Sequence, residues 1–195
     1  MKVCVYGSAS DLIDPKYVKA CFELGEKLAL AGDTLIFGGG AHGVMGASAR
    51  GFKKHGGKII GIVPEFFRQT FAETLFTESD ETHWVDTMYT RKRLMEETSD
   101  AFVIAPGGIG TYDEFFSVLV TKQLMQHSKP IAFFSPYGFY NGMDGVFDDA
   151  VKKGFIKKGC LEMFHIFADA DDLIGYIHSD KPYEYLKYGS VFKDG

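Results

Sequence analysis

The segment Asp100–Phe116 reads DAFVIAPGGIGTYDEFF and joins an apolar strand to a helix through a glycine-rich turn. The apolar run from Ala101 to Ala105 predicts a buried strand. Pro106 ends this strand, because proline has no backbone N–H to donate to the sheet. The order of strand, glycine turn and helix is typical of an α/β fold that binds a ligand where a strand ends.

The turn itself predicts an anion site. Gly107, Gly108 and Gly110 let backbone N–H groups approach a ligand without an intervening Cβ. We expect Thr111 to cap the following helix, whose first amides and dipole favour an anion. Glycine turns after strands often only reverse the chain. Glu114, one helical turn further on, favours a catalytic site over that simpler interpretation.

Two familiar nucleotide motifs do not account for this turn. The chain contains no G-x-x-x-x-G-K-[ST] sequence, and the turn lacks the G-x-G-x-x-G spacing of a dinucleotide fold. We therefore expect a monophosphate ligand.

Composition limits the class of protein. The chain has 195 residues, 46% hydrophobic and 24% charged, which predicts one globular domain over residues 1–195. A net charge of −5 disfavours nucleic-acid polymers and anionic membranes as partners. The three cysteines, Cys4, Cys21 and Cys160, are odd in number and lack metal-ligand spacing, so we expect no disulfide and no metal site. With no apolar run near 18 residues, the predicted location is the cytoplasm.

Seven short apolar runs alternate with amphipathic stretches and predict strands. They are KVCVYG, DTLIFG, KIIGIV, THWV, DAFVIA, KPIAFFS and MFHIFA. Their nearly continuous apolarity predicts burial on both faces, hence a doubly wound α/β fold whose mainly parallel sheet has helices on both faces. One helix is expected to begin at Pro15, with Asp14 as its N-cap and Gly32 as its stop.

Three glycine turns are expected to share one crevice, because ligands of open α/β sheets bind beyond the carboxyl ends of the strands. These turns are Gly7-Ser8, Gly38–Gly40 and Pro106–Gly108. In the second turn the glycines could equally serve close packing of helix on sheet. His42, a lone loop histidine there, is assigned no chemistry.

The segment Asp86–Ser99, DTMYTRKRLMEETS, predicts a helix with an arginine on its buried side. Arg91 shares a stripe with Met88 and Met95, which should face the core. A buried guanidinium needs a counter-charge, and Glu114 and a bound anion are the candidates. The alternative is an ion pair that only fastens two helices.

Met88-Tyr89-Thr90-Arg91-Lys92, followed by Pro106 to Glu114, resembles the paired signature of the LONELY GUY family, M-x-x-R-K and then P-G-G-x-G-T-x-x-E. The resemblance extends over most of the chain. It implies a Rossmann-like fold, a dimer and no cofactor. The implied activity is hydrolysis of the N-glycosidic bond of a nucleoside 5′-monophosphate, such as a cytokinin riboside 5′-monophosphate or AMP.

The resemblance also implies roles for individual residues. Arg91 and Glu114 would be catalytic, with the carboxylate stabilising positive charge on the sugar or orienting water. Lys92, which lies off the buried stripe of its helix, is expected to be solvated or at the rim, and it is counted among the predicted substrate-binding residues. The 5′-phosphate would bind to Gly107, Gly108, Gly110 and Thr111.

Two further residues are predicted to contact the substrate. Met88 would pack against the base, and Ser8 would reach the sugar or the base. Asp113 projects away from Glu114 around the helix and is expected to be a partner of the helix dipole rather than a second acid.

Departures from the family pattern affect the base specificity. Tyr89 stands where many members have His, and Phe37 where Tyr is common, so the preferred base stays open. A different class of function is a non-catalytic nucleotide or molybdenum-cofactor carrier, for which Glu114 beside an inward Arg91 would have no use. Members of the family were long labelled lysine decarboxylases, but no Schiff-base lysine can be identified.

The rest of the chain supports two structural expectations. A helix is predicted from Met143 to Lys153 with Val146, Phe147 and Ala150 in the core. The tyrosine-rich tail from Lys181 is expected to pack on its own domain or on a partner.

Overall fold

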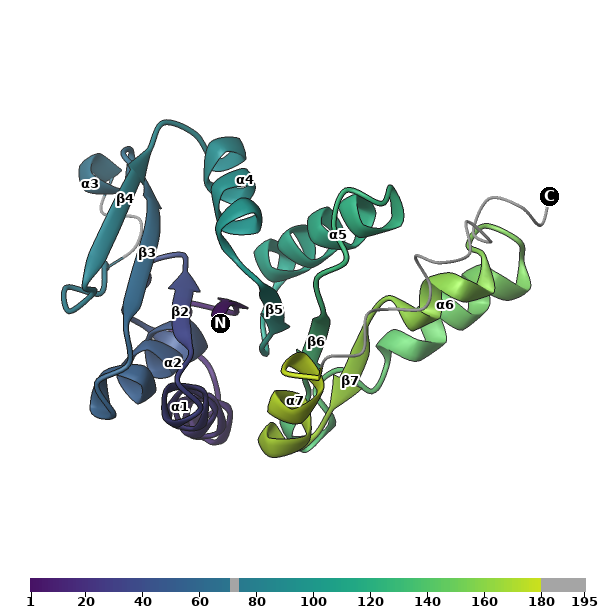
Figure 1. Cartoon of the computed structure of the whole chain (residues 1–195), viewed down its shortest axis with the longest axis horizontal. Coiled ribbons are helices and arrows are strands. Elements are labelled where there is room, and N and C mark those ends of the chain that lie inside the picture. Colours follow the sequence, from purple (N-terminus) through teal and green to yellow (C-terminus); the bar gives the residue numbers. More distant parts are fainter. Residues whose placement is uncertain (71–73, 180–195) are drawn as a thin grey trace.

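The computed structural model describes residues 1–70 and 74–179, and it contains one seven-stranded sheet (Figure 1). All paired strands run parallel. The order across the sheet is β4-β3-β2-β1-β5-β6-β7. The strands are β1 (Lys2–Tyr6), β2 (Thr34–Phe37), β3 (Ile59–Pro64), β4 (Glu81–Val85), β5 (Ala101–Ile104), β6 (Ile131–Phe134) and β7 (His165–Phe167). The seven predicted runs and the parallel doubly wound architecture are confirmed.

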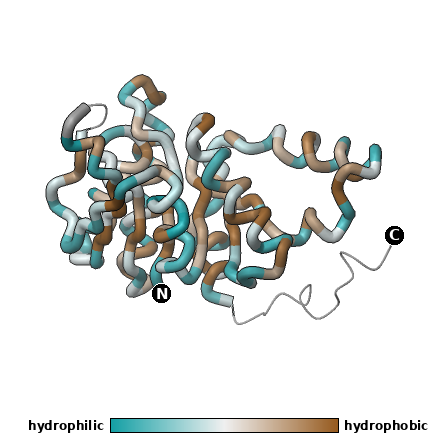
Figure 2. Tube along the Cα trace, turned by 90° about the horizontal axis from the view of Figure 1, so that it is seen from above, coloured by the Kyte–Doolittle hydropathy of each residue, from teal (hydrophilic) through white to brown (hydrophobic). Residues whose placement is uncertain are grey.

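Helices cover both faces of the sheet (Figure 1). One face carries α1 (Pro15–Leu30), α2 (Gly43–Lys54) and α7 (Ala170–Ile177), and the other carries α4 (Met88–Thr98), α5 (Ile109–Gln123) and α6 (Met143–Lys152). Shorter elements are α3 (Phe67–Thr70) and the 3-10 turns η1 (Pro136–Gly138) and η2 (Lys158–Glu162). Figure 2 shows hydrophobic segments through the interior of the molecule, and nearly all residues of β1, β2, β5 and β6 are buried. Each helical layer therefore closes its own hydrophobic core against the sheet.

The direction of winding reverses between β1 and β5. From β1 the chain builds outward through β2 and β3 to β4, and then returns to place β5 beside β1 before continuing to β6 and β7. β1 and β5 pair from Val3 with Ala101 to Tyr6 with Ile104. The carboxyl ends of these two strands form the topological switch point, where ligands of such sheets bind.

Helix ends follow the local sequence signals. Asp14 accepts a hydrogen bond from the amide of Lys16 at the start of α1, with Pro15 in the first position. Gly32, just past the end of this helix, has a φ of +82°, which favours glycine. Thr87 caps α4 by accepting from the amide of Thr90. The predicted cap at Asp14 is confirmed.

Two expectations are wrong. The N-cap of α5 is Gly108, and Thr111 is 4% exposed inside the first turn of the helix rather than capping it. Val146 is 64% exposed, although Phe147 is buried as expected and Ala150 is half-buried. The buried stripe of α6 runs through Met143 and Phe147, which leaves Val146 on the flank of the helix.

The tyrosine-rich tail from Lys181 lies outside the described residues. Among the described helices, no segment has both the length and the apolarity needed to cross a bilayer.

Lys122, near the end of α5, is a buried lysine that local sequence patterns did not predict. Its side chain is 1% exposed, and its Nζ donates to the carbonyl oxygen of Lys129 at 2.9 Å. Burial lowers the pKa of its amine from 10.5 to about 7. Folding therefore disfavours the charged form of this group.

Replacing Lys122 with Met should raise the free energy of unfolding at pH 7 and increase the Tm by several degrees, about the shift expected for a change of 1 kcal/mol or more. Between pH 7 and 10.5 the unfolded chain binds more protons at Lys122 than the folded chain, so this residue makes stability rise with pH. The free energy of unfolding, measured with urea across this pH range, should rise less steeply with pH in the Lys122→Met variant than in the wild type. Equal slopes in both proteins would contradict the assigned cause.

Candidate active site

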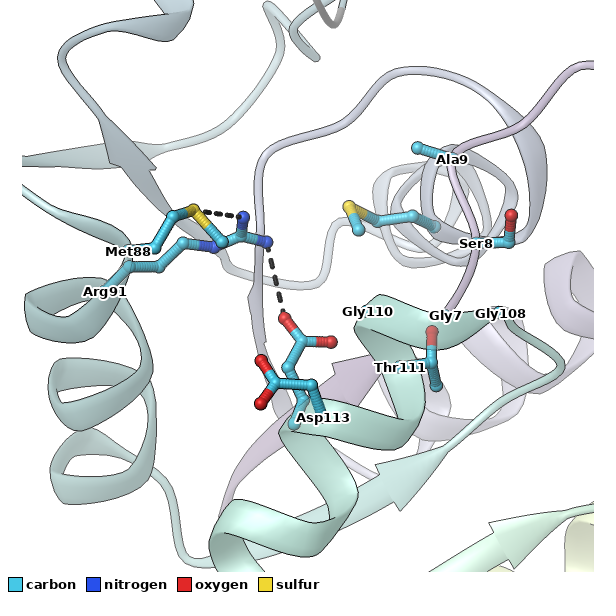
Figure 3. Close-up of a pocket in the computed structure, with 11 residues that line it drawn as sticks. Gly7, Ser8, Ala9, Met88, Arg91, Gly108, Gly110, Thr111 and Asp113 are labelled. Carbon is cyan, nitrogen blue, oxygen red and sulfur yellow. Dashed lines mark hydrogen bonds and ion pairs between the residues drawn. The ribbon is translucent and has the colours of Figure 1, made fainter.

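A crevice with a volume of about 260 Å³ opens at the carboxyl ends of β1 and β5 (Figure 3). It is lined by Gly7, Ser8, Ala9, Met45, Met88, Arg91, Gly108, Gly110, Thr111, Asp113 and Glu114. These residues come from the loop after β1, the start of α2, the start of α4 and the start of α5. Its volume is close to the lower end of the range for small-molecule sites.

The loops after β1 and β5 are bonded to each other. The amide of Ser8 donates to the carbonyl oxygen of Pro106 at 3.2 Å, and the amide of Met45 donates to the carbonyl oxygen of Ser8 at 3.0 Å. A Cβ at Gly7 would lie 2.9 Å from a methyl carbon of Val44. Close packing at Gly7 thus brings the β1 loop, the β5 loop and the start of α2 into one wall of the crevice.

The glycines of the β5 turn have two different functions. A Cβ at Gly107 would lie 2.1 Å from the Thr111 hydroxyl oxygen, so this glycine lets the turn pack onto the first turn of α5. A Cβ at Gly108 or Gly110 would meet no described atom within 4 Å. Both of these residues line the crevice, so a side chain there would occupy space open to a ligand. The first amides of α5, which have no partner within a helix, lie at this point.

Arg91 extends from α4 into the crevice (Figure 3). The residue is 4% exposed, and its Nη2 lies 3.6 Å from Oε1 of Glu114. A Cβ at Gly38 would lie only 1.8 Å from Nη2, so the glycine after β2 provides the space that the guanidinium occupies. Arg91 Nε is buried without a hydrogen-bond partner among the described residues. The guanidinium therefore retains donor capacity beyond its pairing with Glu114.

The carboxylate of Glu114 lies at the border between crevice and core, because the residue is 7% exposed. Burial raises the pKa of the Cys4 thiol to about 12, with the charge of Glu114 contributing in the same direction. Burial also raises the pKa of the Tyr6 phenol well above its usual range. Cys4 and Tyr6 thus remain neutral at physiological pH.

A second ion pair connects the neighbouring residues of the same two helices. Lys92 Nζ lies 2.9 Å from both carboxylate oxygens of Asp113, and it donates to the Ser117 hydroxyl at 3.3 Å. The side chains of this pair are 25% and 57% exposed, so solvent screens the interaction. The pair holds α4 beside α5 at the rim of the crevice.

The structure gathers seven of the nine residues predicted for the site at the crevice. They are Ser8, Met88, Arg91, Gly108, Gly110, Thr111 and Glu114. Gly107 lies beneath the lining, against Thr111, and Lys92 is directed to Asp113 rather than into the crevice.

Sequence reasoning did not predict that Ala9, Met45 and Asp113 would line the crevice. The sequence could have suggested Met45, since it lies at the start of the helix that directly follows a glycine-rich loop. His42, assigned no chemistry from the sequence, lies 2.9 Å from Asp11 and is not part of the lining.

Fold and site together define an α/β protein of Rossmann-like topology with a small-molecule crevice at its switch point. Solved structures share this fold. The molybdenum cofactor carrier protein from Chlamydomonas reinhardtii matches with a TM-score of 0.69 and 22% identity, covering 90% of this chain and 94% of that one. The molybdenum cofactor binding protein from Rippkaea orientalis matches with a TM-score of 0.68 and 20% identity, again over 90% and 94%.

Sequence comparisons identify the family. The family model described as "Possible lysine decarboxylase" matches residues 45–177. The cytokinin riboside 5′-monophosphate phosphoribohydrolase of Mycobacterium tuberculosis is 32% identical over 88% of this chain and 90% of its own length. A probable enzyme of the same name from Oryza sativa, LOGL5, is 34% identical over 89% of this chain and 70% of its own length. The chain belongs to this family, the LONELY GUY family, as its two motifs indicated.

The two ion pairs between α4 and α5 should differ in strength. A double-mutant cycle with Arg91→Leu and Glu114→Gln should give a coupling free energy of about 1–3 kcal/mol, because both side chains are almost fully buried. The same cycle with Lys92→Met and Asp113→Asn should give less than about 1 kcal/mol, since this pair is partly exposed. Urea unfolding of the two sets of variants measures both values. A larger coupling for the second pair would contradict the assignment of Arg91 and Glu114 as the buried pair.

Proposed function

We propose that this protein hydrolyses the N-glycosidic bond of a nucleoside 5′-monophosphate, a cytokinin riboside 5′-monophosphate or an AMP-like nucleotide, to give the free base and ribose 5-phosphate. The observation that carries the proposal is the buried pair of Arg91 and Glu114 beside the N-terminus of α5. The relatives named above are phosphoribohydrolases and support the same reaction.

Glu114 is the residue proposed to act on the sugar. Cleavage of the glycosidic bond leaves the electron pair on the base and develops positive charge at the anomeric carbon of the ribose. A carboxylate fixed beside this carbon stabilises the charge and accepts a proton from the attacking water. Pairing with Arg91 orients the Glu114 carboxylate.

Arg91 and the β5 turn are proposed to bind the 5′-phosphate. Arg91 lines the crevice, and the first amides of α5 lie beside it where Gly108 and Gly110 also line the crevice. Charge-assisted hydrogen bonds from both would hold the phosphate and so place the sugar against Glu114. A nucleoside without the phosphate loses these contacts.

The base is proposed to lie between two methionines. Met88 on α4 and Met45 on α2 line the crevice, and the Met45 sulfur accepts a hydrogen bond from the amide of Gly40 at 3.2 Å. Flexible thioether side chains pack well against aromatic rings and adapt to their substituents. Ser8, at the end of β1, is proposed to contact the sugar.

A Schiff-base decarboxylase and a non-catalytic carrier are the two alternatives. Neither accounts for the arrangement of Arg91 and Glu114 as well as a hydrolase does. The described lining of the crevice contains no lysine that could form a Schiff base, and Lys92 at its rim is paired with Asp113. A carrier would require the phosphate cradle but not a carboxylate held against an arginine.

The test of this function is base release from a panel of nucleotides. Purified protein is incubated with isopentenyladenosine monophosphate, AMP and other nucleoside monophosphates, together with the matching nucleosides, and the free base is measured by chromatography. Monophosphates should release base and nucleosides should not. Glu114→Gln should lower the rate at least about 100-fold, because it removes the acid–base and charge-stabilising group.

A matched control separates the role of Glu114 from a general effect of losing a carboxylate. Glu97, on the exposed side of α4 and paired with Arg93 at 3.8 Å, is far less buried, so Glu97→Gln should retain wild-type turnover. If folded wild-type protein releases no base from any nucleotide, the hydrolase assignment fails for that panel. Nucleotide binding without turnover would then favour the carrier.

We further propose that the protein acts as a homodimer in the cytoplasm. An apolar stripe on α5, Phe116, Val120 and Leu124, is 43–54% exposed, and Phe116 stacks on Phe147 of α6 at 6.2 Å. A second copy of the same surface would cover this stripe in a two-fold interface.

The buried free thiols of Cys4, Cys21 and Cys160 fit a reducing compartment, and cell fractionation checks that location.

Val120→Glu should convert the dimer into a monomer, because it places a charge at the centre of the apolar stripe. Size-exclusion chromatography with light scattering measures the mass. Leu30→Glu is the matched control, since Leu30 is 68% exposed at the end of α1, away from α5. A wild-type monomer, or a dimer that survives Val120→Glu, would overturn this interface.

A further inference from the structure

Tyr140, which follows the η1 turn, connects two segments that are distant in sequence. Its ring is 1% exposed, and its hydroxyl donates to the carbonyl oxygen of Ala105 at 2.8 Å. Ala105 is the residue between β5 and the glycine turn, 35 positions earlier in the chain. A buried phenol that reaches this carbonyl contacts the turn at the point where it begins.

The same ring also contacts the other end of the turn. Tyr112, directly after Thr111 on α5, meets Tyr140 edge to face with the ring centroids 6.1 Å apart. Tyr140 thus touches the residue before the anion-binding turn and the residue after it. Phe133 of β6 also packs against the Tyr140 ring, with the ring centroids 4.6 Å apart, so the ring is fixed by the core of the sheet.

Several contacts besides those of its ring hold Tyr140 in position. Its backbone amide donates to the hydroxyl of Ser135 at 2.9 Å, and Ser135 is 2% exposed. The intervening turn includes Tyr137, a non-glycine residue with a φ of 57°. A left-handed conformation is unfavourable for such a residue and persists where the surrounding structure holds it.

An anion site made of backbone amides requires that the neighbouring carbonyl oxygens be turned away from the anion. The carbonyl of Pro106 accepts from the amide of Ser8, and that of Ala105 accepts from the hydroxyl of Tyr140. Both carbonyls that precede the glycines are therefore occupied by donors of the protein. The Tyr140 hydroxyl oxygen in turn accepts from the backbone amide of Gly107, so the groups left for an anion are the first amides and the dipole of α5.

We propose that Tyr140 is a positioning residue for phosphate binding: by holding the carbonyl of Ala105 and packing on Tyr112, it fixes both ends of the turn 105–112 so that the first amides of α5 face the phosphate. The proposal rests on the proposed function for the identity of the ligand, a phosphate monoester. Tyr140 does not line the crevice and acts through the turn. Burial raises the pKa of its phenol well above the usual range, so the hydroxyl keeps the proton that it donates.

Tyr140→Phe tests this directly, because it removes the hydroxyl and keeps the ring. The KM for the nucleoside monophosphate should rise about five- to tenfold, the effect of one buried hydrogen bond, while kcat changes less than about twofold. The Kd for ribose 5-phosphate and for inorganic phosphate, measured by calorimetry, should weaken by a similar factor. The Kd for the free base should not change, which a general loss of structure would not predict.

Tyr17→Phe is the matched control. Tyr17 contacts Phe139 of the same segment edge to face at 5.4 Å but is on α1, and it does not touch the turn 105–112 through any described contact. This variant should bind phosphate and turn over substrate as the wild type does.

If Tyr140→Phe does not fold, Ser135→Ala replaces it. This variant removes the acceptor of the Tyr140 amide and should weaken phosphate binding in the same direction by a smaller factor. An unchanged phosphate Kd in the folded variant, or an equal loss of phosphate and free-base binding, would overturn the positioning role.

The test of Tyr140 gives an answer even if the proposed hydrolysis is wrong. Should the wild type bind ribose 5-phosphate but release no base, the hydrolase assignment fails, and the phosphate Kd of Tyr140→Phe still decides the role of Tyr140. Should the wild type bind neither ribose 5-phosphate nor inorganic phosphate, the positioning role is overturned along with the phosphate site.

Discussion

The pairing of β1 with β5 at the centre of the sheet is the constraint on which the site depends. It places two loops from distant parts of the sequence side by side, and the hydrogen bond from Ser8 to Pro106 joins them. Because all strands are parallel, their carboxyl ends meet at one edge, and the helices that follow begin there. The crevice is a consequence of this topology, and its chemistry comes from the residues that the topology collects.

A buried charge organises one side of the crevice. The guanidinium of Arg91 can be removed from water only if space and a counter-charge are available. Gly38 provides the space and Glu114 the counter-charge, although they follow different strands. Arg91 Nε is buried without a hydrogen-bond partner among the described residues, which is unfavourable for the fold by itself. The charge of Arg91 is therefore retained in the fold at a cost in stability.

On the other side of the crevice, the turn 105–112 offers backbone amides rather than lysine side chains. The phosphate affinity proposed for it would depend on the shape of the turn. Neutral residues such as Gly107, which packs on Thr111, and Tyr140, which holds the Ala105 carbonyl, hold that shape. An overall charge of −5 is compatible with the proposed site, because a helix N-terminus acts on an anion locally.

The sequence by itself determined the seven strands, the parallel sheet, the cap at Asp14 and the inward direction of Arg91. Those features follow from local periodicity and capping chemistry, which act over a few residues. Only the tertiary structure decided that Gly108 rather than Thr111 begins α5, and which residues approach the crevice from elsewhere. Met45 reaches the crevice because α2 packs against the loop after β1, where the amide of Met45 donates to the carbonyl oxygen of Ser8. Such packing depends on contacts between distant segments, which no local pattern encodes.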